Sequence, residues 1–229
     1  MYKRVLLKLS GEALGCPYDI NILDSISKQI KKLVEEGIEV GVVIGGGNIC
    51  RGKTFEKLGL DRKEADYIGM EATIMNAQML TAALIKNGVS AKTLSTVKVQ
   101  RVLDYSKEKA LSLLKKKVVC VFGGGTGKPF FSTDTGSALR AKDINADVIL
   151  MAKNGVDGVY NDDPDTNPNA TRYNEMTFND IIINKLGVID LKAAEICKKN
   201  HIEAFVFDMA VKNNIVKAAK GKAIGTVIK

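Results

Sequence analysis

The chain alternates short apolar runs with longer stretches in which apolar residues recur every three or four positions. The apolar runs predict buried strands at Arg4 to Leu9, Ile38 to Ile44, Lys92 to Leu94, Val118 to Phe122, Asp147 to Met151, Ile202 to Phe207 and Thr226 to Ile228. The helical spacing predicts helices at Asn21 to Glu36, Glu64 to Asn87, Ser106 to Leu114, from Thr135 onward, Thr177 to Leu186, Leu191 to Asn200 and Val211 to Ala219. This alternation favours an α/β fold, with a mainly parallel sheet covered by helices on both faces.

Glycine-rich loops follow three of the predicted strands, at Ser10-Gly11, at Gly45 to Asn48 and at Gly123 to Gly125. Glycine lets the backbone approach a phosphate closely, and a helix start favours an anion. Because the carboxyl ends of parallel strands share one edge of a sheet, the three loops predict one composite phosphate site. The alternative is that each loop is only a turn, with Asp134 capping the helix that follows.

Two basic side chains lie beside these loops. Lys8 interrupts an apolar strand, where an ammonium is costly unless it meets an anion; the alternative is that it reaches the surface. Arg51 follows the second loop and could bind a phosphate bidentately, or it could be a surface arginine. Lys153 could contact the same phosphates or be a solvated loop residue, and the sequence favours neither.

Composition narrows the class of protein. The 229 residues are 45% hydrophobic, which suits one large α/β domain. The net charge of +8 is spread along the chain, so we expect anionic nucleotides, and not nucleic acid, as the main partners.

The same sequence predicts a cytoplasmic location. No apolar run approaches the roughly 20 residues of a membrane span, and we expect neither a membrane segment nor a signal peptide. The four cysteines form no CxxC pair, which indicates reduced thiols. The single histidine, His201, has no Cys or His cluster near it, so we predict no protein-built metal site.

The phosphate loops match neither GxxxxGK[ST] nor GxGxxG. Instead, four ordered segments resemble the bacterial UMP kinases of the amino-acid-kinase superfamily: Lys8 to Leu14, Gly45 to Asn48 with Arg51-Gly52, Thr126 to Asp134, and Val156 to Tyr160 with Asp163-Pro164. The resemblance spans essentially the whole chain. It implies a three-layer α/β/α sandwich with a mainly parallel central sheet, formed by a single domain over residues 1–229. The acceptor-binding part would be about 1–150 and the ATP-binding part about 151–229.

The resemblance also implies an activity. The chain would transfer the γ-phosphoryl group of ATP to UMP, giving ADP and UDP in pyrimidine nucleotide synthesis, with Mg²⁺ and as a homohexamer. The catalytic residues would be Lys8, Asp134 and Arg51. The ATP site would comprise Lys8, Leu9, Ser10, Gly11, Gly47, Arg51, Asn154, Tyr160 and Asp163. The UMP site would comprise Gly46, Asp66, Thr126, Gly127, Lys128, Pro129, Phe130, Phe131, Ser132 and Thr133, with Asp66 accepting a hydrogen bond from the ribose.

Two features depart from the family's pattern. Lys128 stands where the family often has asparagine, and Gly15 to Tyr18 is shorter than the glycine-rich insertion of many bacterial members, so we expect weak or absent activation by GTP. Two other functions stay open at this point. A carboxylate or carbamate kinase of the same superfamily would share the phosphate site, although the segment Thr126 to Thr133 with Asp66 suits a nucleotide. A nucleotide-sensing regulator would bind UMP or nucleic acid without turnover. A turnover assay over these substrates separates the three functions.

Overall fold

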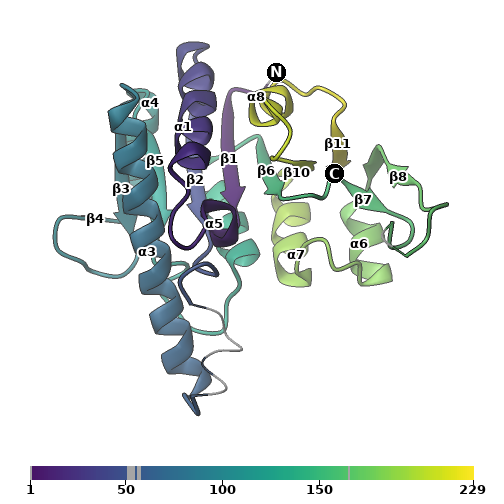
Figure 1. Ribbon diagram of the computed structural model, residues 1–229, viewed down its shortest axis with the longest axis horizontal. Helices are drawn as coiled ribbons and strands as arrows, with labels where there is room; N and C mark the ends of the chain where they lie inside the picture. Colours follow the sequence, from purple (N-terminus) through teal and green to yellow (C-terminus); the bar gives the residue numbers. More distant parts are fainter. Residues whose placement is uncertain (1, 51–54, 56–57, 165) are drawn as a thin grey trace.

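The computed structural model describes residues 2–50, 55, 58–164 and 166–229, and a twisted sheet forms its centre (Figure 1). The strands of this sheet are β1 Arg4–Leu9, β2 Glu39–Ile44, β3 Ala91–Ser95, β4 Leu103–Asp104, β5 Val119–Gly123, β6 Val148–Lys153, β9 Glu175–Met176, β10 Glu203–Asp208 and β11 Gly225–Ile228. Their order is β4-β3-β5-β2-β1-β6-β10-β11-β9. The β10–β11 pair is antiparallel and the other pairs recorded in this sheet are parallel. A separate hairpin pairs β7 Val159–Tyr160 with β8 Arg172–Tyr173.

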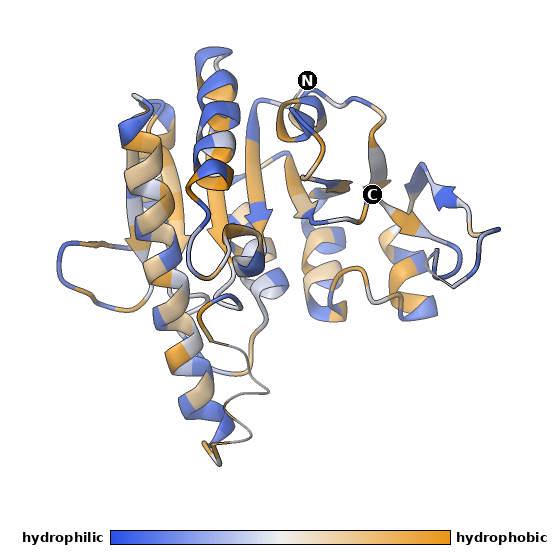
Figure 2. Ribbon diagram, viewed as in Figure 1, coloured by the Kyte–Doolittle hydropathy of each residue, from blue (hydrophilic) through white to orange (hydrophobic). Residues whose placement is uncertain are grey.

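Helices cover both faces of the sheet. One face packs against α1 Ile20–Glu35, α3 Arg62–Lys86 and α8 Asn214–Ala219. The other packs against α4 Lys107–Lys115, α5 Thr133–Ile144, α6 Phe178–Asn184 and α7 Leu191–Asn200. Figure 2 shows the strands mainly in apolar colours, while α1 turns polar residues outward. The predicted three-layer sandwich with a mainly parallel sheet is confirmed.

Alternation along the central strands decides which side chains face which helices. On β1, Leu7 belongs to the core beneath α1 and α3, while Leu6 belongs to the core beneath α5 and α7. Successive side chains of a strand point to opposite faces, so Lys8 shares the face of Leu6. On β6, Met151 also belongs to the core beneath α5 and α7. The face covered by α5 and α7 therefore receives the functional side chains at the strand ends.

The start of α5 corrects one sequence-based alternative. Ser132 is the N-cap, and its hydroxyl accepts a hydrogen bond from the Thr135 amide at 3.0 Å. Asp134 lies in the first turn of the helix and does not cap it. Its carboxylate is therefore available to another partner, while its charge still complements the helix dipole.

Most predicted elements are present with ends shifted by one or two residues. The largest shift is in α8, which begins at Asn214 and not at Val211, because Asn213 adopts a left-handed conformation with φ of 65°. The two-residue strands β4, β7, β8 and β9 and the 3₁₀ helix η1 Gly11–Leu14 were not predicted, since segments this short carry no periodicity.

The long helix α3 has apolar residues on more than one side. Among the described residues, α3 is the one helix whose length and composition would allow it to cross a membrane. Core helices of soluble proteins pass the same test, so this is weak evidence for a membrane span. One side of α3 packs on the sheet through Ala77, Leu80 and Leu84. The other side leaves Met75 and Ile85 more than half exposed. The apolar composition of α3 thus comes from a core face together with an uncovered face.

Candidate functional site

The glycine loops meet at the carboxyl edge of the sheet. A Cβ atom added to Gly11 would lie 2.4 Å from the carbonyl oxygen of Gly45 and 2.8 Å from the amide nitrogen of Gly47. A Cβ atom added to Gly45 would lie 3.4 Å from the hydroxyl oxygen of Thr133, at the start of α5. The loop after β1 therefore packs directly on the loop after β2, and no side chain fits between them. Their backbone amides are brought to one place next to a helix N-terminus.

Lys8 and Asp134 form an ion pair at this place. Lys8 Nζ lies 2.8 Å from Asp134 Oδ1, and the side chains are 10% and 18% exposed. The alternative in which Lys8 extends to the surface is wrong. Among the described residues, Asp134 Oδ1 is buried and meets this ammonium but accepts no hydrogen bond from another group. The pair thus joins a central strand to the first turn of α5, with the glycine loops beside it.

Asp190 reinforces the start of α5 from the neighbouring helix. It is the N-cap of α7 and accepts a hydrogen bond from the Ala193 amide at 2.8 Å. The same carboxylate accepts hydrogen bonds from the hydroxyl groups of Ser132 and Thr135. The sequence analysis missed Asp190, although an aspartate directly before a predicted helix could have indicated a cap.

A buried amide holds the second glycine loop in place. Asn76 of α3 is 0% exposed, and its Nδ2 donates to Gly45 O at 2.7 Å and to Asn48 Oδ1 at 2.8 Å. Its Oδ1 accepts from the Tyr18 hydroxyl at 2.9 Å, and Asn48 Nδ2 donates to Gly15 O at 3.0 Å. The sequence analysis also missed this network. A polar residue beside the apolar stripe of a long predicted helix could have indicated it.

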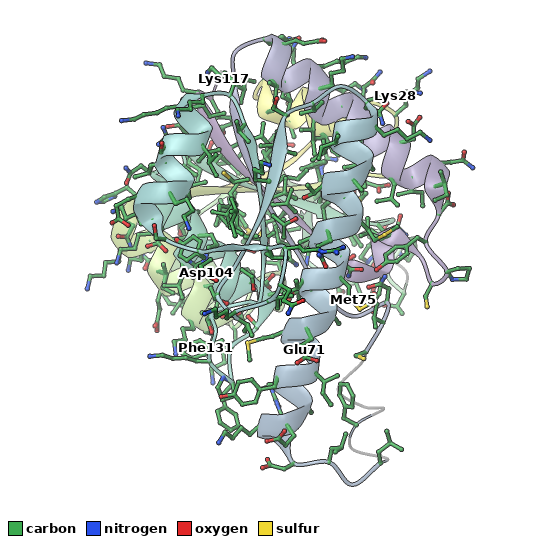
Figure 3. The ribbon with its side chains drawn as sticks, turned by 90° about the vertical axis from the view of Figure 1, so that its left-hand side faces the viewer. Lys28, Glu71, Met75, Asp104, Lys117 and Phe131 are labelled. Carbon is green, nitrogen blue, oxygen red and sulfur yellow. The ribbon has the colours of Figure 1, made fainter. Side chains whose placement is uncertain are left out.

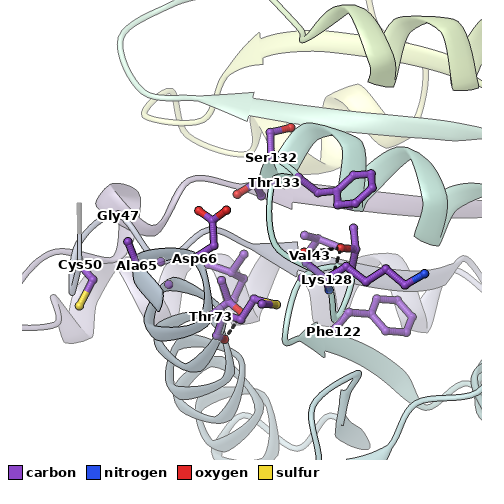
Figure 4. A pocket seen from close by; sticks show the side chains of 18 of the residues that line it. Val43, Gly47, Cys50, Ala65, Asp66, Thr73, Phe122, Lys128, Ser132 and Thr133 are labelled. Carbon is purple, nitrogen blue, oxygen red and sulfur yellow. Dashed lines mark hydrogen bonds between the residues drawn. The ribbon is translucent and has the colours of Figure 1, made fainter. Parts of the chain in front are cut away.

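A cavity of about 530 Å³ opens beside the ion pair (Figure 4). Figure 4 shows Asp66 and Thr73 on α3 along one side, with Ser132 and Thr133 on the opposite side. The predicted UMP residues that line it are Gly46, Asp66, Thr126, Lys128, Phe131, Ser132 and Thr133, joined by Gly47 from the predicted ATP set. Gly127, Pro129 and Phe130 do not line it. Lining residues that were not predicted include Phe55, Gly69, Met70, Thr73 and Arg140.

Asp66 connects α3 to the loop that precedes α5. Its Oδ2 accepts a hydrogen bond from the Phe130 amide at 2.6 Å, and its Oδ1 accepts one from Arg62 Nε at 3.0 Å. Phe130 has a φ of 68°, a backbone conformation that residues other than glycine rarely adopt. The loop therefore keeps a costly backbone geometry between the lining residues Lys128 and Phe131, and the Asp66 carboxylate helps to hold it.

The predicted ATP residues that the structure describes lie outside this cavity, apart from Gly47. Leu9 is completely buried in the core, so only its backbone is available to a ligand. Asn154 follows β6 and is exposed, and the Tyr160 hydroxyl donates to Asp157 Oδ1 at 2.7 Å. The amide of Asp163 donates to Asp162 Oδ1 within the loop after β7. Ser10 and Gly11 lie at the end of β1, and Arg51 lies outside the described residues.

Taken together, the geometry suits the binding of anions on both sides of Lys8. Backbone amides, a helix N-terminus and a partly buried ammonium converge at the edge of the sheet, and each favours negative charge. The cavity next to them has polar and aromatic walls and is large enough for a small ligand.

The chain is similar to proteins of one family over most of its length. The model of the amino acid kinase family matches residues 3 to 208. A uridylate kinase from Limosilactobacillus reuteri (strain DSM 20016) is 45% identical over 99% of this chain and 97% of its own. The crystal structure of a UMP kinase from Bacillus anthracis has a TM-score of 0.96 at 37% identity and covers 100% of this chain and 96% of its own. A UMP kinase from Ureaplasma parvum has a TM-score of 0.95, also at 37% identity, over 100% and 99%.

The Asn76 network yields a prediction about stability. Replacing Asn76 with alanine removes the donor to Gly45 O, and we expect the free energy of unfolding to fall by about 1–3 kcal/mol because buried groups lose their partners. Urea denaturation measures this change. Gln78→Ala, at an exposed position of the same helix, is the matched control and should stay within about 0.5 kcal/mol of the unaltered chain. Equal stability of the two variants would show that the network contributes nothing.

Proposed function

This chain belongs to the amino acid kinase family, and we propose that it transfers the γ-phosphoryl group of ATP to UMP, giving ADP and UDP. The observation that carries the proposal is the Lys8–Asp134 pair, set between two glycine loops and next to a cavity lined by most of the predicted UMP residues. The relatives with the same fold along their whole length are named uridylate kinase or UMP kinase, which supports the same acceptor here.

The cavity is the proposed acceptor site. Its volume of about 530 Å³ lies within the usual range for small-molecule sites. The phosphate of UMP would lie against the backbone amides near Gly46, and the nucleoside would lie against the segment from Thr126 to Thr133. Asp66 would accept a hydrogen bond from the ribose while it keeps its contact with the Phe130 amide.

The opposite side of Lys8 is the proposed donor site. Residues Lys8 to Gly11, Gly47 and Arg51 would surround the ATP phosphates, and Asn154, Tyr160 and Asp163 would hold the adenine nucleotide. In this arrangement, the acceptor-binding part would comprise residues about 1–150, which also supply the contacts to the ATP phosphates, and the part that holds the adenine nucleotide would comprise residues about 151–229. The two parts adjoin where β1 pairs with β6 in the middle of the sheet.

The chemistry requires positioning and charge neutralisation more than a covalent intermediate. Lys8 would neutralise charge on the phosphoryl group as it passes from donor to acceptor. Asp134 would act on Lys8, because a fixed carboxylate holds the ammonium at one place. The amides of the glycine loops and the N-terminus of α5 would stabilise the oxygens that carry charge in the transition state.

Magnesium fits this site through the nucleotide. Among the described residues, no group of three His, Cys, Asp or Glu side chains is placed to hold a metal ion, and Mg²⁺ bound through phosphates needs few protein ligands. Asp134, whose buried Oδ1 has spare acceptor capacity, is the residue that would orient a water bound to the ion. When bound, Mg²⁺ would add charge neutralisation on the phosphates.

The uncovered face of α3 suits an assembly of identical subunits. Tyr67, Met75 and Ile85 are 37%, 53% and 57% exposed at helical spacing, and Met75 is seen on the outer side of α3 in Figure 3. Exposed apolar residues along one helix are typical of subunit interfaces. We include a homohexamer in the proposal, together with a role in pyrimidine nucleotide synthesis. We also propose a cytoplasmic location, and immunoblotting of cell fractions would check that location.

The proposed reaction predicts a pattern of substrates. In a coupled assay of ADP release with Mg-ATP, we expect strong turnover with UMP and weaker turnover with dUMP, which lacks a ribose hydroxyl. We expect little with CMP, acetylglutamate or aspartate. Turnover on a carboxylate would contradict the acceptor and favour another kinase of the family. Binding of UMP without turnover on any substrate would favour a nucleotide-sensing regulator.

A second prediction concerns Lys8. Lys8→Met should lower kcat by about 100- to 1000-fold, because a preorganised charge next to the transferred group is lost. Steady-state kinetics with UMP measures the effect, and Lys28→Met, at an exposed lysine of α1, is the control. The double variant Lys8→Met/Asp134→Asn removes both members of the ion pair and leaves no Asp134 carboxylate without its Lys8 partner, so it should fold well and remain inactive. Near-normal kcat in Lys8→Met would remove Lys8 from the mechanism.

The third prediction concerns the assembly. Met75→Glu places a charge on the uncovered face of α3, and we expect the mass in solution to fall from six chains toward smaller species. Light scattering after size exclusion measures this mass. Ile183→Glu is the control, because Ile183 is 75% exposed on α6, away from α3. A monomeric unaltered chain would exclude the hexamer.

A further inference from the structure

Lys153 lies next to Lys8 at the edge of the sheet. The strands β1 and β6 are parallel neighbours, with Lys8 opposite Met151 and Leu9 opposite Ala152. Lys153 is the next residue of β6, so it reaches the same edge beside Ser10. Because side chains alternate, Lys153 shares the face of Met151, and this is the face on which Lys8 meets Asp134. Two lysines therefore project toward the same helices.

The charges at this place do not balance. Asp134 is paired with Lys8 at 2.8 Å. Lys153 Nζ donates to the carbonyl oxygen of Val188 at 3.2 Å, and among the described residues no carboxylate lies within 4.0 Å of it. The Asp190 carboxylate is already held by two hydroxyl groups and the Ala193 amide. The cluster of Lys8, Lys153 and Asp134 thus carries one positive charge in excess.

This excess charge is partly buried, which makes it costly. Burial lowers the pKa of the Lys153 ammonium, and the positive charge of Lys8 lowers the pKa further, while Asp134 acts in the opposite direction. A nearby like charge can lower a lysine pKa only when the two groups are close enough to repel. An anion placed between the two ammonium groups would relieve this repulsion, and a phosphate is the anion that the proposed reaction supplies.

We propose that Lys153 is a further catalytic residue, whose ammonium contacts the phosphates of the donor nucleotide from the β6 side while Lys8 contacts them from the β1 side. This inference rests on the proposed function, since it takes a nucleoside triphosphate as the ligand. It also explains why a lysine stands at the end of this buried strand, where a partly buried charge is more costly to the fold than a neutral side chain.

A structural role is the competing explanation, and the Val188 contact defines it. If Lys153 served only to hold the loop before α7, any side chain that donates a hydrogen bond there would be sufficient. Glutamine keeps an N–H donor but carries no charge. Lys153→Gln therefore separates the two roles better than a deletion of the whole side chain.

The experiment compares Lys153→Gln and Lys153→Met with Lys142→Met, at an exposed lysine of α5. We expect both Lys153 variants to lower kcat for UMP phosphorylation by about 100- to 1000-fold, with the KM for UMP nearly unchanged, since Lys153 does not line the acceptor cavity. Thermal unfolding serves as the check on folding. A Lys153→Gln enzyme with kcat within threefold of the unaltered chain would overturn the proposal, whatever Lys153→Met does.

A binding measurement tests the role of Lys153 separately from the proposed function. Calorimetry in the absence of any acceptor measures the affinity of the same variants for Mg-ATP. If the unaltered chain fails to phosphorylate UMP, the proposed function fails, but a tenfold or greater loss of Mg-ATP affinity in Lys153→Gln still supports the phosphate contact. Unchanged affinity in that case overturns it.

Discussion

The ion pair between Lys8 and Asp134 is the interaction on which the arrangement of the site depends. A lysine that is 8% exposed in the middle of a sheet is tolerated because a carboxylate meets it. That carboxylate comes from the first turn of α5, so the pair fixes the N-terminus of the helix against the end of β1. Beside these joined elements, the glycine loops after β1 and β2 pack directly on one another, with no room for a side chain at Gly11.

The rest of the site satisfies backbone groups that this geometry would otherwise leave without partners. Loops at the edge of a sheet lose the hydrogen bonds of the strands, and a buried carbonyl without a donor is costly. Asn76 supplies a donor to Gly45 O from α3, and Asp66 accepts from the Phe130 amide from the same helix. One long helix thus stabilises two loops that are far apart in the sequence. This explains why α3 carries polar groups on a side that is otherwise apolar.

The sequence analysis predicted the strands of four or more residues, the α-helices and a mainly parallel sheet covered on both faces, because those follow from periodicity and from the order of elements. It also predicted that separate glycine loops would share one edge, because parallel strands leave no other arrangement. It did not find Asn76 or the part that Asp190 plays beside α5, since these roles depend on which loop lies against which helix. It also left Lys8 with two possible orientations. Only the packing of α5 on β1 decides between a surface lysine and one paired with Asp134.

The two sides of Lys8 differ in how they accommodate negative charge. The proposed acceptor side is a cavity lined by glycine, polar and aromatic residues, which can hold a ligand of fixed shape. The proposed donor side holds more positive charge than its carboxylates neutralise, because Asp134 pairs with Lys8 while Lys153 donates to the carbonyl oxygen of Val188. A flexible polyphosphate gains more from charge than from shape, whereas a nucleoside gains more from shape. The imbalance therefore lies on the side where a triphosphate would bind, and the charge that arrives with it would complete the electrostatics of the site.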